Sequence, residues 1–199
     1  MSLPPLSQCR SPPTTARSIF SKPATSHCCS TACPITSGST LPSNVQARAG
    51  NGVQTDLSIR GTTFEQTLVL VNGFRLNDPE SGHLNLDIPL PLEAISRIDV
   101  LHGSGSTFYG SDAIGGAVNL ITAPPTAASV FTKAGFGSYG AEEQHLQADY
   151  TTKRLAEQFT GSRDTSNGFI QDRGYHANAL ASETWLRTKP GTTDVLLAG

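Results

Sequence analysis

The sequence has no apolar run that approaches the roughly 18 residues a membrane-spanning helix needs, so we predict no transmembrane helix. Transmembrane strands remain open, because each shows only a weak alternation over about ten residues. The first twenty residues, MSLPPLSQCRSPPTTARSIF, also lack a continuous apolar segment. We therefore predict no signal peptide in this chain.

Charged residues make up only 15% of the chain and aromatic residues 7%. Much of the polar surface must then come from Ser, Thr, Asn, Gln and Gly, which favours a β-rich, loop-rich structure over a helical bundle. Residues 56–122 contain three Arg, no Lys and eight Asp or Glu, a net charge of −5. This acidic segment argues against nucleic-acid binding, which needs a cationic surface.

Cysteine is absent after residue 33; the four cysteines are Cys9, Cys28, Cys29 and Cys33. Their spacing does not match the paired C-x-x-C units of a zinc site, so unpaired thiols are the better interpretation. Residues 1–43 also hold seven of the 13 prolines and show no hydrophobic period. We predict that this segment is disordered and, from the abrupt change near Ser43, that it is a foreign beginning joined to a real domain.

From Asn44 the pattern becomes that of a folded domain. Apolar strands are expected at residues 57–59, 67–71, 98–101 and 117–122, with a tight turn at Asn72-Gly73 and a short helix at residues 91–95. The pair Pro124-Pro125 ends the domain, because consecutive prolines stop both strands and helices. Residues 44–125 are therefore predicted to form an α+β domain, a small mixed sheet with short helices.

After Pro125 the sequence alternates polar and apolar residues between short turns rich in Gly, Asn and Pro. Five strands are expected, at residues 130–137, 143–152, 156–163, 175–187 and 193–197. They predict an antiparallel meander in residues 126–199, with some strands long enough to cross a bilayer. A soluble β-domain would show the same alternation.

Glycines punctuate the segment from Gly103 to Gly116, but they fit no nucleotide or nucleophile motif. A phosphate loop needs Lys and then Ser or Thr where Gly116 and Ala117 stand, and Ser104 and Ser106 are not in a G-x-S-x-G elbow. Their expected role is conformational, together with Gly61 and Gly73. The structural glycines are thus Gly61, Gly73, Gly103, Gly110, Gly115 and Gly116. The histidines lie near no plausible nucleophile with an orienting acid, so we predict no enzyme activity, no cofactor and no metal site.

Several separated blocks nevertheless match one family in order and spacing. They are Ile59-Arg-Gly61, Val100-Leu-His-Gly103, Phe108-Tyr-Gly110, Ala113-Ile-Gly-Gly116 and the apolar strand Val118–Thr122. Over about residues 44–125 the chain resembles the plug domain of TonB-dependent outer-membrane receptors, in particular those for vitamin B12 and catecholate siderophores. The family usually carries Asp where this chain has Asn72, and Arg where it has His102.

The resemblance implies roles for two groups of residues. The loop Asn77–Asp87 and the residues before it would face the extracellular side and touch ligand; the residues in question are Phe74, Arg75, Asp78, Glu80, His83 and Asp87. As an alternative, this acidic loop is simply solvated. Arg60, Asp99 and His102 would help to seat the plug against the barrel, or would form an ordinary ion pair at the sheet edge. A salt bridge at His102 is in doubt, because a histidine is partly neutral near pH 7.

The resemblance also implies a function, which is active uptake of a scarce ligand such as a ferric siderophore or cobalamin. Its partners would be the ligand, outer-membrane lipid and the TonB complex, although no TonB box is identifiable. A 22-stranded barrel needs well over about 400 residues, so we expect a fragment with a plug, incomplete at its N-terminus, and the first strands of an incomplete transmembrane β-barrel. The alternative is a stand-alone soluble β-rich binding or interaction protein.

Overall fold

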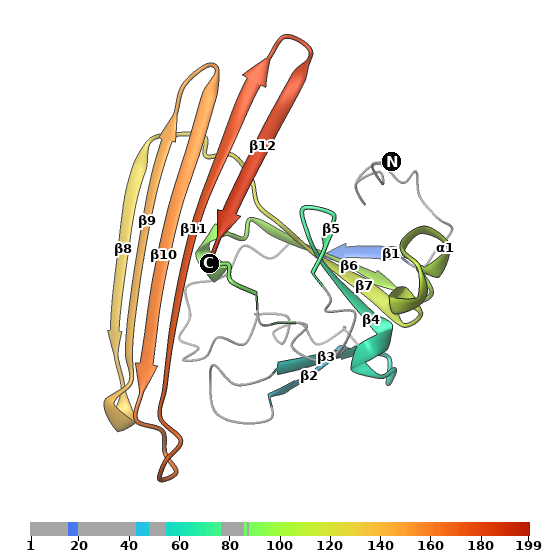
Figure 1. Cartoon of the computed structure of the whole chain (residues 1–199), viewed down its shortest axis with the longest axis vertical. Helices are drawn as coiled ribbons and strands as arrows, with labels where there is room; N and C mark the ends of the chain where they lie inside the picture. The colour runs from blue at the N-terminus through green and yellow to red at the C-terminus, as the bar shows by residue number, and fades with distance from the viewer. Residues whose placement is uncertain (1–15, 20–42, 48–54, 77–85, 87) are drawn as a thin grey trace. The chain divides into compact units, whose positions relative to one another are not determined.

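The computed structural model describes residues 16–19, 43–47, 55–76, 86 and 88–199. These residues divide into two units, which are described separately (Figure 1). The first unit comprises Met1–Ile88 with Ile95–Thr122, and the second comprises Pro89–Ala94 with Ala123–Gly199. Among the described residues, no helix has the length and hydrophobicity required to cross a membrane.

The first unit contains a mixed five-stranded sheet. In spatial order its strands are β1 (Ala16–Ile19), β6 (Arg97–His102), β7 (Gly116–Ile121), β4 (Thr67–Val71) and β5 (Phe74–Arg75). β4 and β7 are parallel, and the other neighbours are antiparallel. The sheet confirms the predicted mixed topology.

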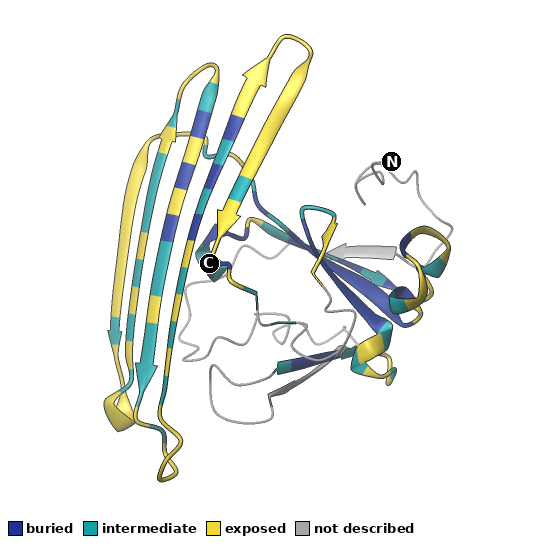
Figure 2. Cartoon of the chain, in the orientation of Figure 1, coloured by how far each residue is buried: buried dark blue, intermediate teal, exposed yellow. Residues whose placement is uncertain are grey.

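The core of this unit forms on β4 and its neighbours. All five residues of β4 are buried, as expected for an uninterrupted apolar run in a central strand (Figure 2). Leu68 and Leu70 pack with Tyr109, Ala113 and Ala117. Burying a leucine side chain in this way stabilises the fold by roughly 1.5–3 kcal/mol.

A separate two-stranded sheet pairs β2 (Ser43–Ala47) with β3 (Thr55–Ile59) in antiparallel register. In β3, Leu57 and Ile59 are fully buried while Ser58 between them is half-buried, which is the alternation expected of a half-buried strand. After β3 the chain turns and forms η3 (Phe64–Gln66), which leads directly into β4.

Short helices lie between the strands of the first unit and in the segment Pro89–Ala94 of the second unit. The glycine-rich segment between β6 and β7 contains α1 (Ser106–Tyr109) and η5 (Ser111–Ala113), where the sequence predicted only a tight loop. The helix predicted at residues 91–95 is η4 (Leu92–Ala94), a single 3-10 turn. Its Ala94 amide donates a 3.0 Å hydrogen bond to the Pro91 carbonyl.

β1 lies within the segment that the sequence predicted to be disordered. Its backbone pairs with β6, from Ala16 opposite Leu101 to Ile19 opposite Ile98. Such pairing uses main-chain N–H and C=O groups, so it needs no apolar pattern that a sequence reading could detect. The rest of residues 1–42 lies outside the described residues.

The second unit contains an antiparallel meander. Its strands follow one another in space as in the sequence: β8 (Ser129–Phe136), β9 (Glu142–Thr151), β10 (Leu155–Ser166), β11 (Tyr175–Thr188) and β12 (Gly191–Ala198). A 3-10 turn, η6 (Ser138–Gly140), joins β8 to β9. The sheet is open, with β8 and β12 at its two edges (Figure 1). All five strands predicted from alternation are present within a few residues of their expected bounds.

Candidate functional site

The β4–β5 hairpin is held against β7 by a polar clamp. Asn72 Nδ2 donates to Thr122 Oγ1 at 2.8 Å, and the Thr122 amide donates back to Asn72 Oδ1 at 3.0 Å. The Gly73 amide donates to Asn119 Oδ1 at 3.0 Å. Asn72 and Gly73 both have positive φ, at 51° and 85°, as a tight turn with this sequence requires. The clamp therefore fixes where the chain enters the predicted ligand loop.

Arg75, one of the predicted ligand residues, is engaged within its own unit. Its Nη2 donates to the Tyr109 carbonyl at 2.7 Å and lies 3.2 Å from Asp112 Oδ2. These contacts tie the hairpin to the glycine-rich segment. Phe74 beside it is 75% exposed, so its ring is open to solvent or to a partner.

Four further residues were predicted to touch ligand. Asp78, Glu80, His83 and Asp87 lie outside the described residues. Their role in ligand binding stays a prediction.

The three residues predicted to seat the plug lie on or beside the mixed sheet. Asp99 is half-buried on β6 and pairs with Arg97, with Nε and Oδ1 3.0 Å apart. His102 is 7% exposed at the end of β6, and Arg60 is exposed in the turn after β3. Burial lowers the pKa of His102, and the nearby charge of Arg60 lowers it further. The pKa direction favours a neutral His102 near pH 7, which fits the doubt about a salt bridge there.

The glycine-rich segment brings backbone close to backbone. Gly116 has a φ of 152°, and a Cβ there would collide with the Leu101 carbonyl oxygen of the neighbouring strand. Gly115 faces the Thr62 side chain, where a Cβ would lie 2.7 Å from Cγ2. At residue 116, only glycine allows this approach to the backbone without displacing β6. The other predicted structural glycines, Gly61, Gly73, Gly103 and Gly110, all have positive φ.

The open sheet of the second unit has one polar face. Directly opposed residues of antiparallel strands share a face, so the register places Asp149, Gln158 and Glu183 in one row. Gln158 and Glu183 are 8% and 2% exposed, and Gln158 Nε2 donates to Asp149 Oδ1 at 3.1 Å. The same face carries Glu143, His145, Gln147, Thr160 and Asp164.

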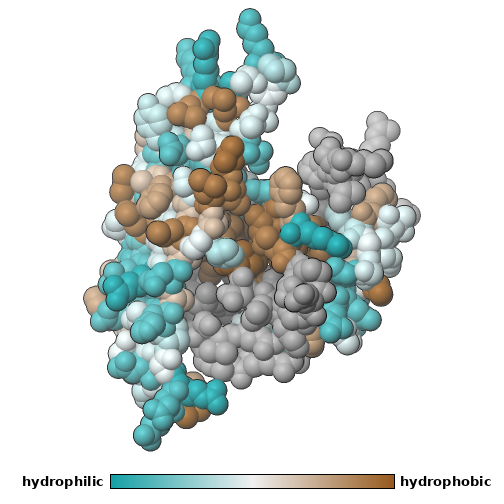
Figure 3. All heavy atoms as spheres, viewed as in Figure 1, coloured by the Kyte–Doolittle hydropathy of each residue, from teal (hydrophilic) through white to brown (hydrophobic). Residues whose placement is uncertain are grey.

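The opposite face of this sheet is apolar. Its rows include large side chains that are between 41% and 74% exposed, namely Val130, Leu146, Tyr150, Phe159, Leu180, Val195 and Leu197. Figure 2 shows the resulting alternation of buried and exposed residues along β10 and β11. In Figure 3, hydrophobic atoms gather toward the middle of the long strands and hydrophilic atoms toward their ends. An exposed apolar area of this kind marks an interaction surface.

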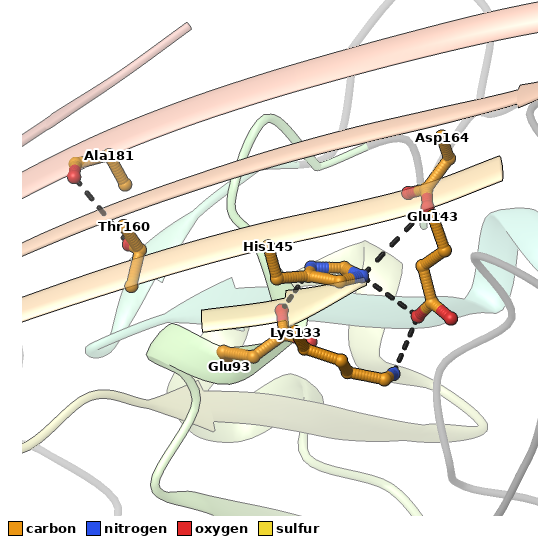
Figure 4. A network of polar contacts seen from close by, with 7 residues as sticks. All are labelled: Glu93, Lys133, Glu143, His145, Thr160, Asp164 and Ala181. Carbon is orange, nitrogen blue, oxygen red and sulfur yellow. Dashed lines mark hydrogen bonds and ion pairs between the residues drawn. The ribbon is translucent and has the colours of Figure 1, made fainter. Parts of the chain in front are cut away.

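The polar face holds a charged cluster around His145, which we call the His145 cluster; it consists of Glu93, Lys133, Glu143, His145 and Asp164 (Figure 4). His145 Nδ1 lies 3.1 Å from Glu93 Oε2, and its Nε2 lies 2.8 Å from Glu143 Oε1. The same Glu143 oxygen accepts from Lys133 Nζ at 2.6 Å. Burial alone would raise the pKa of Glu93, but the hydrogen bond and charge of His145 outweigh it and the pKa is lowered.

Three members of the cluster also have the donor set of a metal site. One ligand atom each from Glu143, His145 and Asp164 lies within 4.8 Å of the others. The sequence predicted no metal site, and no nucleophile with an orienting acid near the histidines. Two features of the sequence could have indicated part of this cluster. Glu143 and His145 are two residues apart and so share one face of a strand, and Lys133 lies opposite His145 when β8 pairs with β9. Glu93 could not be found this way, since it lies outside the meander.

Comparison with known proteins gives the family. Residues 38–117 match the model of the TonB-dependent Receptor Plug Domain family. Among curated proteins, the chain is 35% identical over 147 residues to the vitamin B12 transporter BtuB of Vibrio vulnificus, covering 71% of this chain and 22% of that protein. It is 41% identical over 101 residues to BtuB of Photobacterium profundum, covering 50% of this chain and 16% of that protein.

Solved structures agree on the fold. The siderophore receptor PirA from Pseudomonas aeruginosa aligns with a TM-score of 0.52 at 27% identity, covering 71% of this chain and 27% of that chain. The copper transporter OprC aligns with a TM-score of 0.64 at 15% identity, covering 79% of this chain and 26% of that chain, a likeness of fold alone. These relatives are named as transporters and receptors, which fits the expectation of no enzyme activity. The chain spans about a fifth of the length of the curated relatives it matches. In residues 38–117, the chain therefore carries the plug domain of a TonB-dependent receptor.

Proposed function

We propose that this chain is part of an outer-membrane receptor that takes up a scarce ligand, such as cobalamin or a ferric siderophore. Residues 44–125 would act as the plug that closes the lumen, and residues 126–199 would contribute the first strands of the barrel wall. The observation that carries the proposal is a two-faced sheet, polar on one side and apolar on the other, directly following a plug domain.

The apolar face has the form that lipid requires. On β10 it extends from Leu155 to Gly161, six steps of about 3.4 Å or roughly 20 Å in all. This approaches the apolar band of about 25 Å on transmembrane barrels. Glu157 interrupts the band near one end, in the same row as Tyr150, where strands meet the membrane interface.

The connections between strands supply an orientation. Residues 152–154 and 189–190 make short turns at one end of the sheet, whereas residues 137–141 and 167–174 make longer loops at the other end. Transmembrane barrels have short periplasmic turns and longer extracellular loops. We infer that the end with the short turns is periplasmic. β11, with 14 residues, spans roughly 46 Å and is long enough to cross the bilayer.

The names of the relatives support a proposal for the ligand and for the energy source. Curated relatives are named as vitamin B12 transporters and one structural relative above 25% identity as a siderophore receptor, so a cobalamin or a ferric siderophore is the proposed cargo. Coupling to the TonB complex is proposed on the same ground. Exposed Phe74, at the start of the predicted apical loop, is the described residue best placed to touch cargo.

A plug exchange tests the gating role. Residues 44–125 would replace the plug of Vibrio vulnificus BtuB, and cells making the chimera would be tested for entry of vancomycin, an antibiotic too large for ordinary porins. We expect the chimera to exclude the antibiotic, because the transplanted domain fills the lumen. The control is the same transporter with its plug deleted, which should leak.

The proposal fails if the chimera reaches the outer membrane in normal amount yet leaks as much as the plugless control. Cobalamin-dependent growth of the same cells addresses the cargo. Growth at limiting cobalamin would favour cobalamin as the cargo.

A further inference from the structure

The segment Pro89–Ala94 is an excursion of the chain from one unit to the other. The residues before and after it, Ile88 and Ile95, belong to the first unit, while the segment itself belongs to the second. Its only helical turn, η4, carries Glu93, whose carboxylate meets His145 on β9. The contact is largely withdrawn from water, since the Glu93 and His145 side chains are 22% and 8% exposed.

We propose that Glu93 and His145 form an anchoring ion pair that fixes Pro89–Ala94 on the polar face of the β8–β12 sheet. Both ring nitrogens of His145 face carboxylate oxygens, at 3.1 Å from Glu93 and 2.8 Å from Glu143. Nε2 is hydrogen-bonded to Glu143, whereas Nδ1 and Glu93 Oε2 lie within ion-pair distance without hydrogen-bond geometry. Carboxylates on both sides of the ring favour the imidazolium, because a nearby opposite charge stabilises the charged form. The Glu93–His145 contact is therefore an attraction between opposite charges 3.1 Å apart, largely withdrawn from water.

The surroundings of His145 hold the imidazolium in place. Glu143 on the same strand accepts from it and is itself held by Lys133 of β8 at 2.6 Å. Asp164 of β10 lies 3.9 Å from Nε2. With Glu93 from η4, these are the charged groups that face the ring among the residues the structure describes, and together with His145 they carry a net charge of −1. The cluster thus favours a protonated histidine without needing a further cation.

A metal ion is the competing interpretation of the same side chains. The metal ion would have to replace the proton on His145 Nε2. It would also have to displace Lys133, whose Nζ lies 2.6 Å from Glu143 Oε1. A ligating histidine often has its other nitrogen next to a carboxylate, and His145 Nδ1 lies beside Glu93. The experiment below therefore includes a zinc arm.

Because Pro89–Ala94 is covalently continuous with the plug on both sides, the anchor has a mechanical consequence. If residues 88 and 95 move away from the β8–β12 sheet, the segment between them must either stretch or give up the Glu93–His145 pair. The inference does not depend on which cargo is taken up.

Hydrogen exchange of the Ala94 amide, measured on the full chain, tests the anchor. This amide donates to the Pro91 carbonyl and so reports whether η4 is intact. We expect Glu93→Gln and His145→Gln each to speed its exchange by roughly five- to tenfold, the loss appropriate to a half-buried ion pair that is partly screened. The double variant should be no faster than either single one, because both remove the same contact.

Matched controls use the same substitutions at exposed positions of the same sheet. Glu157→Gln on β10 and His176→Gln on β11 should leave Ala94 exchange within twofold of the parent. Exchange of β9 and β10 amides shows whether the sheet itself is unchanged in each variant. The ion pair needs a deprotonated Glu93 and a protonated His145. After correction for intrinsic exchange, protection of the Ala94 amide should therefore be greatest in the pH range where both groups are charged.

Two results would overturn the anchor. The first is an effect of Glu93→Gln and His145→Gln no larger than that of their controls, or effects that simply add in the double variant. The second is a slowing of Ala94 exchange by stoichiometric Zn²⁺ that a chelator reverses, which would make the cluster a metal site. We expect zinc to change nothing.

Discussion

At the scale of single residues, the side-chain amide of Asn72 both donates and accepts a hydrogen bond, whereas a carboxylate in its place could only accept. Asn72 donates to Thr122 Oγ1 and accepts from the Thr122 amide, while its backbone takes a φ of 51°. Asparagine is among the few non-glycine residues that adopt this conformation readily. The presence of Asn72, where the family usually carries Asp, is therefore compatible with the same turn.

Replacing Asn72 by Ala should destabilise the first unit by about 2 kcal/mol, because two hydrogen bonds are lost and alanine tolerates the positive φ poorly. Asn72→Asp should cost less than about 1 kcal/mol, since it keeps an acceptor for the Thr122 amide. Native-state hydrogen exchange of Thr122 measures both. Asn178→Ala, at an exposed position of β11, is the control; an equal effect there would refute the clamp.

A second residue-scale prediction concerns protonation of His102. Its pKa in the folded chain is lowered by burial and then by Arg60, so the folded state disfavours the charged form. The resulting stability is present above the unfolded pKa of about 6.5 and is lost as pH falls through the folded pKa. Unfolding of the first unit should thus become easier below about pH 6.5.

The Arg60→Gln variant separates the two causes. Removing the positive charge should raise the pKa of His102, and NMR titration of its ring protons measures the shift. Arg163→Gln, an exposed arginine of β10, should leave it unchanged. A fall in the His102 pKa in Arg60→Gln would contradict this account.

At the scale of elements, the contact between β6 and β7 depends on the backbone at Gly116. A Cβ there would collide with the Leu101 carbonyl, and backbone atoms cannot rotate away as a flexible side chain could. Gly116→Ala should therefore destabilise the first unit by about 2–4 kcal/mol, seen as loss of protection in β6 and β7 amides. Gly191→Ala, with no atom within 4 Å of its Cβ position, should change stability by less than about 0.5 kcal/mol. Similar effects in the two variants would refute the role of close packing.

Elements with a strong pattern were predictable from sequence, and elements defined by contact were not. The continuous apolar run of β4 predicted a strand buried on both faces, and the alternation of β10 predicted a strand with one exposed face. Each pattern is visible in the sequence because it follows from which faces of the strand are buried. The short helices α1 and η5 were missed, since Gly105 and Gly110 around them predict loops as readily as caps. β1 was missed because main-chain pairing leaves no side-chain signature.

At the scale of the whole molecule, family-level identity was also predictable, since it rests on several motifs in fixed order. The His145 cluster was not, because it joins Glu93 to strands far along the chain and a single sequence does not encode which distant residues meet. The predicted apical residues Asp78, Glu80, His83 and Asp87 stay a prediction. What the architecture adds is a sheet with one polar and one apolar face.

The position of the single tryptophan makes that claim measurable. Trp185 is 5% exposed on the polar face, and Phe159 is 41% exposed on the apolar face. Moving the tryptophan with the pair Trp185→Phe and Phe159→Trp transfers the fluorophore from one face to the other. Both chains would be reconstituted into bilayers whose acyl chains carry bromine, which quenches tryptophan on contact. The account predicts strong quenching at position 159 and weak quenching at position 185; equal quenching at both, or none at 159 in a chain with intact strands, would contradict it.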